Sequence, residues 1–234
     1  MMMDLWDQYN KTRLAGDKKT ATKMLLNFIA LLKEKDKGHI EDFANDLCKK
    51  ALDIDGILPN NGVKVSNDID RIQHPIFKEI VLPILVEQYL EDSPMHIKWI
   101  GQLEQFFYSD KVTTENFLRQ INVEGYFSTL HFLEKSFAID PNQDTLSLLL
   151  KRQAQDIEYL VHELPWMVLT EPADFNLVLA DFKDYLAKSE YKETWRTRLM
   201  EWENIAGHWA VYCARKTFYK DFIDYQEQNN IALA

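Results

Sequence analysis

Apolar residues recur at spacings of three and four along most of this 234-residue chain, and the clearest run lies between residues 126 and 164. Its first half carries an apolar stripe that falls on one face of a helix, at Tyr126, Phe127, Leu130, Leu133 and Phe137. Pro141 ends that helix, because proline has no N–H to donate and excludes the preceding residue from the helical region.

A second helix follows, with either Asn142 or Asp144 placed to cap its first N–H groups. Its apolar stripe runs for about five turns, at Leu146, Leu149, Leu150, Gln153, Ile157, Leu160, Val161 and Leu164. Because the connection between the two helices is short, the pattern predicts an antiparallel helical hairpin.

Most of the remaining sequence repeats this pattern. A stripe at Ala21, Leu25, Phe28, Ile29 and Leu32 follows a break at Ala15-Gly16-Asp17, with Asp17 as the expected cap. Pro75 opens a later helix that Pro83 should kink, Thr113 or Thr114 should cap another, and the last helix is expected to span residues 190–225. Only seven glycines and seven prolines are present, which favours long helices. The sequence therefore predicts an all-α array of about nine or ten helices, packed as successive antiparallel hairpins.

Residues 57–73 are the one long segment without a helical pattern. Loops longer than about 12 residues inside compact domains tend to be functional or mobile. We expect a single domain over residues 1–234, with residues 57–73 as the candidate subdivision, contact surface or plain connector.

The charge of the chain narrows the classes of partner. A formal net charge of −10 opposes binding to nucleic-acid phosphates and to anionic membranes, so neither partner is expected. The charge is uneven: residues 1–37 hold eight Lys or Arg and five Asp or Glu, whereas residues 140–190 hold four and ten. Two solvated faces are the simplest interpretation. Two cysteines, Cys48 and Cys213, predict buried free thiols, and with no signal peptide or membrane span in the sequence we expect a cytoplasmic protein.

The short motifs that usually mark catalysis or metal binding are missing from the sequence. Two pairs of acid and imidazole side chains remain, His131 with Glu134 and Glu158 with His162, each one helical turn apart. If the four converged, they could form a metal or acid–base site between helices. The alternative is that each pair is a surface or locally satisfied polar pair, and we expect no metal and no cofactor.

Tryptophans form a second candidate site. Trp195, Trp202 and Trp209 recur every seven residues on the last helix, with Tyr212 nearby and Trp166 in an apolar connector between Pro165 and Pro172. Such a stripe can form an aromatic cage, a dimer contact or a partner groove. Aromatic residues at helical spacing are more often part of a hydrophobic core, and both interpretations stay open.

Two fragments resemble parts of tetratricopeptide repeats. Ala15-Gly16-Asp17 followed by Ala21 and Leu25 resembles the turn and second helix of such a repeat, and residues 137–142 resemble the junction between two repeats. The resemblance implies a stack of helical hairpins. Together with the helical pattern, it suggests a scaffold that binds a protein, a peptide or a second copy of the chain, with an enzyme built on the four acid and imidazole residues as the alternative.

Overall fold

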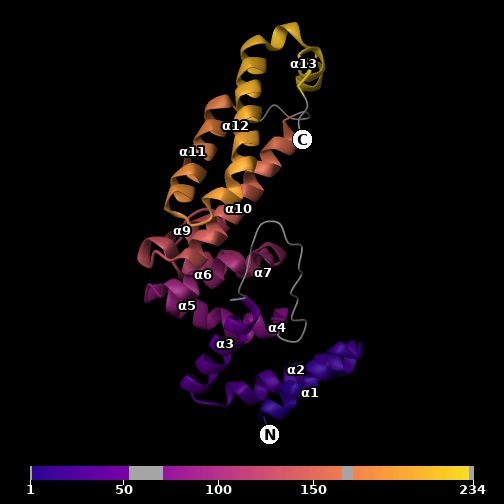
Figure 1. Ribbon diagram of the computed structural model, residues 1–234. Helices are drawn as coiled ribbons and strands as arrows, with labels where there is room; N and C mark the ends of the chain where they lie inside the picture. Colours follow the sequence, from indigo (N-terminus) through magenta and orange to yellow (C-terminus); the bar gives the residue numbers. More distant parts are fainter. Residues whose placement is uncertain (1, 53–70, 165–170, 232–234) are drawn as a thin grey trace. The chain divides into compact units, whose positions relative to one another are not determined.

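The computed structural model (Figure 1) describes residues 2–52, 71–164 and 171–231, and every regular element in these ranges is helical. The predicted all-α fold is therefore confirmed for the described residues. Their helices are numbered up to α13, more than the nine or ten expected, because three of the predicted helices are each divided into shorter ones. The chain forms two compact units, Met1–Asp140 (unit 1) and Pro141–Ala234 (unit 2).

Unit 1 contains α1 (Met2–Leu14), α2 (Lys18–Lys33), α3 (Lys37–Leu52), α4 (His74–Ile76), the π-helix η2 (Phe77–Val81), α5 (Leu82–Leu90), α6 (Pro94–Gln102), α7 (Glu104–Ser109), α8 (Lys111–Gln120) and α9 (Thr129–Ile139). Unit 2 contains α10 (Gln143–Glu163), α11 (Pro172–Lys188), α12 (Lys192–Arg215), the 3-10 turn η3 (Lys216–Phe218) and α13 (Phe222–Gln228). The predicted subdivision at residues 57–73 falls inside unit 1, and residues 53–70 lie outside the described ranges.

The pairing of α1 with α2 follows directly from the sequence. Gly16 adopts a φ of +85°, which lets the chain reverse, and the Asp17 carboxylate accepts a hydrogen bond from the Thr20 N–H at 3.0 Å. All five positions of the predicted α2 stripe are buried. They meet Trp6 and Tyr9 of α1 in the core of unit 1, so α1 packs along α2.

Pro83 acts in an unexpected way. The turn before it is a π-helix, in which the Leu82 N–H bonds to the Phe77 carbonyl five residues earlier. Pro83 cannot donate to the carbonyl four residues before it, and widening the preceding turn accommodates that lost bond. The predicted disruption thus takes the form of a π turn between α4 and α5.

Two predicted helix starts in unit 1 are wrong. α8 is capped by Asp110, which accepts from the Thr113 N–H at 3.0 Å, and not by Thr113 or Thr114. α9 begins only at Thr129, after Ser128, so Tyr126 and Phe127 lie outside the helix on which the stripe had placed them. In both cases a polar side chain upstream satisfies the first N–H groups, which periodicity alone does not reveal.

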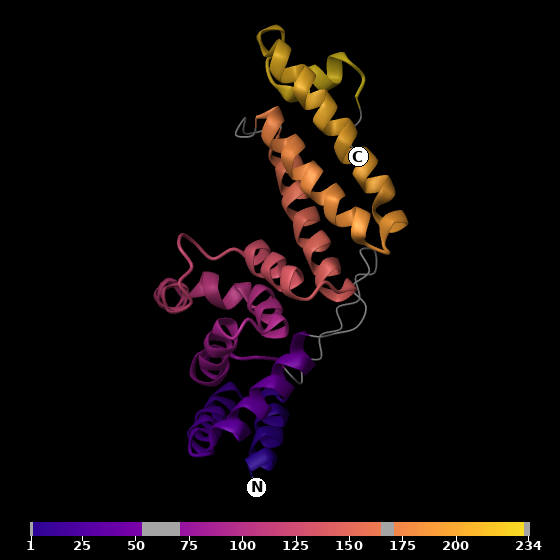
Figure 2. The same cartoon turned by 90° about the vertical axis from the view of Figure 1, so that its left-hand side faces the viewer.

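In unit 2, α11 packs against both α10 and α12, and Figure 2 shows the three helices side by side. Asn142 is the cap of α10, accepting from the Thr145 N–H at 2.9 Å. The predicted final helix is divided after Arg215, because the Asp221 carboxylate accepts from the Asp224 N–H and starts α13. Cys48 is buried as expected, whereas Cys213 is only partly buried. Among the described helices, none has the length and apolar character needed to cross a membrane.

Candidate functional site

The four acid and imidazole residues are divided between two helices, one in each unit. His131 and Glu134 are both exposed on α9 in unit 1, while Glu158 and His162 lie on α10 in unit 2. The His162 Nδ1 atom lies 3.4 Å from a carboxylate oxygen of its neighbour Glu163, and its side chain is exposed. Across the described ranges, no three His, Cys, Asp or Glu side chains are grouped so that they could hold a metal ion.

Glu158 has a different set of partners, all on α12. Its two carboxylate oxygens accept hydrogen bonds from the Arg198 Nε and Nη2 atoms at 2.5 and 2.6 Å, and Oε1 also accepts from the Trp202 Nε1–H at 3.2 Å. Hydrogen bonds from Arg198 to Glu158 and then to Glu201 raise the pKa of the guanidinium above its ordinary value. A carboxylate held in this way joins α10 to α12 and has little freedom to act as a catalytic base.

The tryptophan stripe lies mainly in the interior of unit 2. Trp202 and Trp209 are fully buried, Tyr212 is buried and Trp195 is half-buried. The Phe182 ring of α11 meets Trp195 and Trp202 edge-on, with ring centroids 5.5 and 5.3 Å away. Trp166 lies outside the described residues. The rings therefore fill one another's space, and this geometry favours the core interpretation over an open cage.

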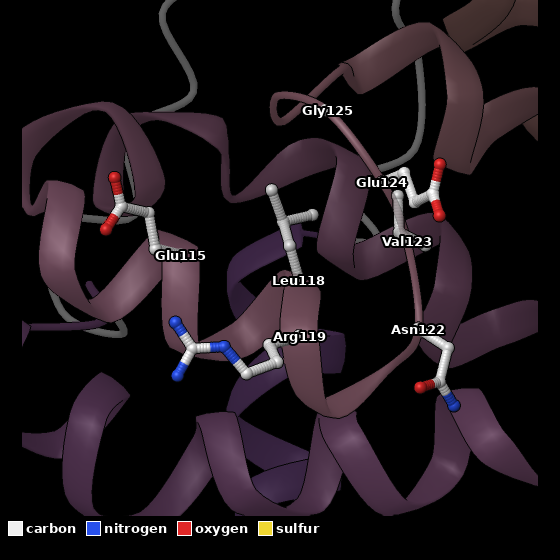
Figure 3. A pocket seen from close by; sticks show the side chains of 7 residues that line it. All are labelled: Glu115, Leu118, Arg119, Asn122, Val123, Glu124 and Gly125. Atoms are coloured by element: carbon white, nitrogen blue, oxygen red, sulfur yellow. The ribbon is translucent and has the colours of Figure 1, made fainter.

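A surface hollow that the sequence did not suggest lies at the C-terminal end of α8. Its volume is about 440 Å³, and Figure 3 shows Glu115 and Arg119 extending from α8 beside the segment that follows it. The lining consists of Glu115, Leu118, Arg119, Asn122, Val123, Glu124 and Gly125.

Local backbone geometry builds this hollow. Asn122 ends α8 in the left-handed region, with φ +55°, so that the Val123 N–H bonds back to the Leu118 carbonyl at 2.9 Å. Gly125 has a φ of +93°, which turns the chain again before α9. The segment from residue 122 to 127 therefore runs beside α8 without being part of a helix.

Phe127 anchors the end of that segment. Its ring is buried and stacks on Phe107, with centroids 4.3 Å apart, and Tyr108 meets it edge-on at 5.8 Å. The preceding residue, Tyr126, is 84% exposed, and Tyr108 is 60% exposed. The buried Phe127 ring thus contacts the exposed Tyr108, and the exposed Tyr126 directly follows Gly125 of the hollow. We call the group Tyr108, Arg119, Asn122 and residues 124–126 the Tyr126 surface.

Several polar groups of the Tyr126 surface have no partner within the described part of the chain. The Arg119 guanidinium makes no ion pair there, and no backbone hydrogen bond joins the N–H groups of residues 124–126 to other described residues. The surface therefore combines exposed aromatic rings, a free cation and available backbone donors.

Comparisons with family models, curated proteins and solved structures give no match to this chain. In the sequence, only Gly125 indicates a break before Tyr126. The apolar spacing extends upstream of the true start of α9, so Tyr126 looks like part of that helix.

Proposed function

We propose that the chain is a binding scaffold of tetratricopeptide-like helical hairpins, and that the Tyr126 surface holds an extended segment of a protein or peptide partner. The pairing of α1 with α2 through the Gly16 turn supports the hairpin part of this proposal. The observation that carries the binding part is the 84% exposure of Tyr126 directly beside the buried Phe127.

Interface energetics explain why that observation matters. Tyrosine and arginine are among the residues that contribute most to binding when they become buried in an interface. Tyrosine loses little conformational entropy on binding, and here the anchored Phe127 fixes the backbone that carries Tyr126. The Tyr126 ring can therefore bury most of its surface against a partner at a low entropic penalty.

The backbone beside Tyr126 supports a peptide in extended form. An extended peptide can pair its own carbonyls with free N–H groups of an exposed segment, while its side chains enter neighbouring hollows. The hollow at α8 has a volume within the usual range for small binding sites, and Leu118 and Val123 supply apolar contacts in it. The Arg119 guanidinium is placed to donate hydrogen bonds to a carboxylate of the partner.

Site-specific photo-crosslinking tests this proposal in the full chain. A benzophenone amino acid replaces Tyr126, and the matched control replaces Tyr159 on α10, which is similarly exposed at 66%. We expect a discrete adduct with a partner from native extract at position 126 only, competed by excess unmodified chain. The identified partner peptide should then bind tenfold or more weakly to Tyr126→Ala, and equally well to Tyr159→Ala. Equal labelling at both positions, or none at 126, contradicts the proposal.

A further inference from the structure

The uneven charge of the sequence appears in the structure as two exposed helix faces of opposite sign. On α2, the side directed away from the core carries Lys19, Lys23, Leu26 and Ala30, and we call it the basic face. α2 contains no Asp or Glu at all, although the chain as a whole has a net charge of −10.

The second face lies on α11 in unit 2. Ala173, Leu177, Ala180 and Asp184 are all exposed and lie opposite the buried residues of the helix, with Asp181 beside them. We call these five residues the acidic face. Each face therefore consists of one exposed leucine, at least one alanine and two charges of a single sign.

The charges on both faces lack partners within the described residues, unlike many of their neighbours. No ion pair or hydrogen bond within the described chain engages the side-chain charges of Lys19, Lys23, Asp181 or Asp184. By contrast, Lys33 at the end of α2 pairs with Glu79 at 2.5 Å, and Lys183 of α11 pairs with Glu203 at 2.9 Å. The four charges of the two faces therefore remain available for a partner outside the described chain.

The two faces also match in spacing. The basic face has residues at 19, 23, 26 and 30, and the acidic face at 173, 177, 180 and 184, which is the same sequence of steps of four, three and four. Two helices with this spacing can interlock along a common seam. The alanines allow the helix axes to approach closely, and Leu26 and Leu177, which are 53% and 62% exposed, can bury each other's apolar surface.

We propose that the basic face of α2 in one copy of the chain docks against the acidic face of α11 in a second copy. The opposite charges of the two faces favour this pairing, whereas the overall charge of −10 repels copies in other orientations. The contact is heterologous, so a pair still offers one unused acidic face on one copy and one unused basic face on the other. Assemblies can therefore grow beyond dimers or close into rings. A single helix-to-helix contact buries little area, so the association is weak and is lost at high salt.

Charge-reversal variants of the two faces test the proposal. Sedimentation velocity measures the association of the full chain across a range of concentrations. Wild type should associate in about 0.05 M salt and dissociate in about 0.5 M salt. The double variants Lys19→Glu/Lys23→Glu and Asp181→Lys/Asp184→Lys should each associate about tenfold or more weakly. Mixing the two variants should restore association, because each then offers a face of the sign that the other lacks.

Lys49→Glu/Lys192→Glu is the matched control, since it changes the net charge equally at two exposed lysines outside both faces. A wild-type chain that stays monomeric at every concentration overturns the proposal, and so does association that falls equally in the control. Flotation with anionic phospholipid vesicles provides a further arm. Vesicle binding by a monomeric chain that is lost in Lys19→Glu/Lys23→Glu would assign the basic face to lipid and also overturn the proposal. The two faces share no residue with the Tyr126 surface, so either proposal can fail while the other stands.

Discussion

Glu158 offers the sharpest test of how unit 2 is held together, because one carboxylate serves two partners of very different exposure. Its ion pair with Arg198 lies near the surface, where the Glu158 side chain is 40% exposed and the Arg198 side chain is 38% exposed. Trp202, whose Nε1–H donates to the same carboxylate, is fully buried. We consider Glu158→Ala and Glu158→Gln, which separate the two contributions.

The magnitudes follow from that difference in exposure. A solvent-screened ion pair contributes roughly 0.2–1 kcal/mol. A buried N–H left without an acceptor costs roughly 1–3 kcal/mol. Glu158→Ala loses both contributions and should lower the free energy of unfolding by about 2–3 kcal/mol. Glu158→Gln keeps an oxygen facing Trp202 and should lower it by less than about 1 kcal/mol. Water entering the vacated position would place the Ala variant at the low end of its range.

Urea unfolding followed by circular dichroism measures the change, and hydrogen exchange locates it. Because Glu158 and its two partners all lie in unit 2, amide exchange in peptides from α10 and α12 should accelerate in Glu158→Ala while peptides from α2 in unit 1 stay unchanged. Glu193→Ala, an 83%-exposed acid on α12, is the control and should change stability by less than about 0.5 kcal/mol. Equal losses for the Ala and Gln variants would refute the dominant role of the Trp202 hydrogen bond.

Substitutions at three positions test unit 1 by the same unfolding measurement. Gly101→Ala should lower stability by about 1 kcal/mol, because the added Cβ would lie 3.1 Å from Leu133 Cγ. This strain exceeds the gain in helix propensity. An unchanged or higher stability contradicts the close approach of α6 and α9. Asn122→Ala should cost about 1 kcal/mol and Asn122→Gly almost nothing, because the residue has a φ of +55°; equal effects would exclude backbone strain as the cause. Burial lowers the pKa of His96 below its ordinary 6.5, with Glu41 opposing the shift. The unfolded chain then binds more protons than the folded one, so stability should fall as pH drops below about 6.5. His96→Gln should lessen that fall, and an identical pH profile in both proteins refutes the assignment.

Helix interiors were predictable from the sequence, whereas several helix ends were not. The α2 stripe was identified at all five positions, because a regular run of apolar residues on one face leaves a helix only one way to pack. The start of α9 was misplaced because the apolar spacing continues through Tyr126 and Phe127. Two local features make α9 start at Thr129. Gly125 has a positive φ, and the Ser128 side chain accepts a hydrogen bond from the His131 N–H.

The candidate sites depended on contacts that the sequence order conceals. Glu158 was paired with His162 because they lie one turn apart on α10. The structure instead joins it to Arg198, forty residues later, through a packing of α10 with α12 that no short motif encodes. Conversely, the seven-residue spacing of Trp202 and Trp209 correctly indicated one face of one helix, and their complete burial assigns that face to the core.

Side chains that have partners inside the chain stabilise its fold. Exposed side chains without such partners can contact a binding partner. Glu158, Trp202 and Trp209, the residues that first suggested chemistry, all have partners within unit 2 and contribute mainly to its packing. Tyr126 and Arg119 differ, because they stay exposed on a segment whose backbone is fixed by Phe127 and the end of α8. An exposed side chain on a fixed backbone loses little entropy when a partner binds. In the complex it gains hydrogen bonds or buries apolar surface, neither of which it does in the unbound chain. We therefore expect a peptide partner to bind at Tyr126 and Arg119, and not at the buried tryptophans of α12.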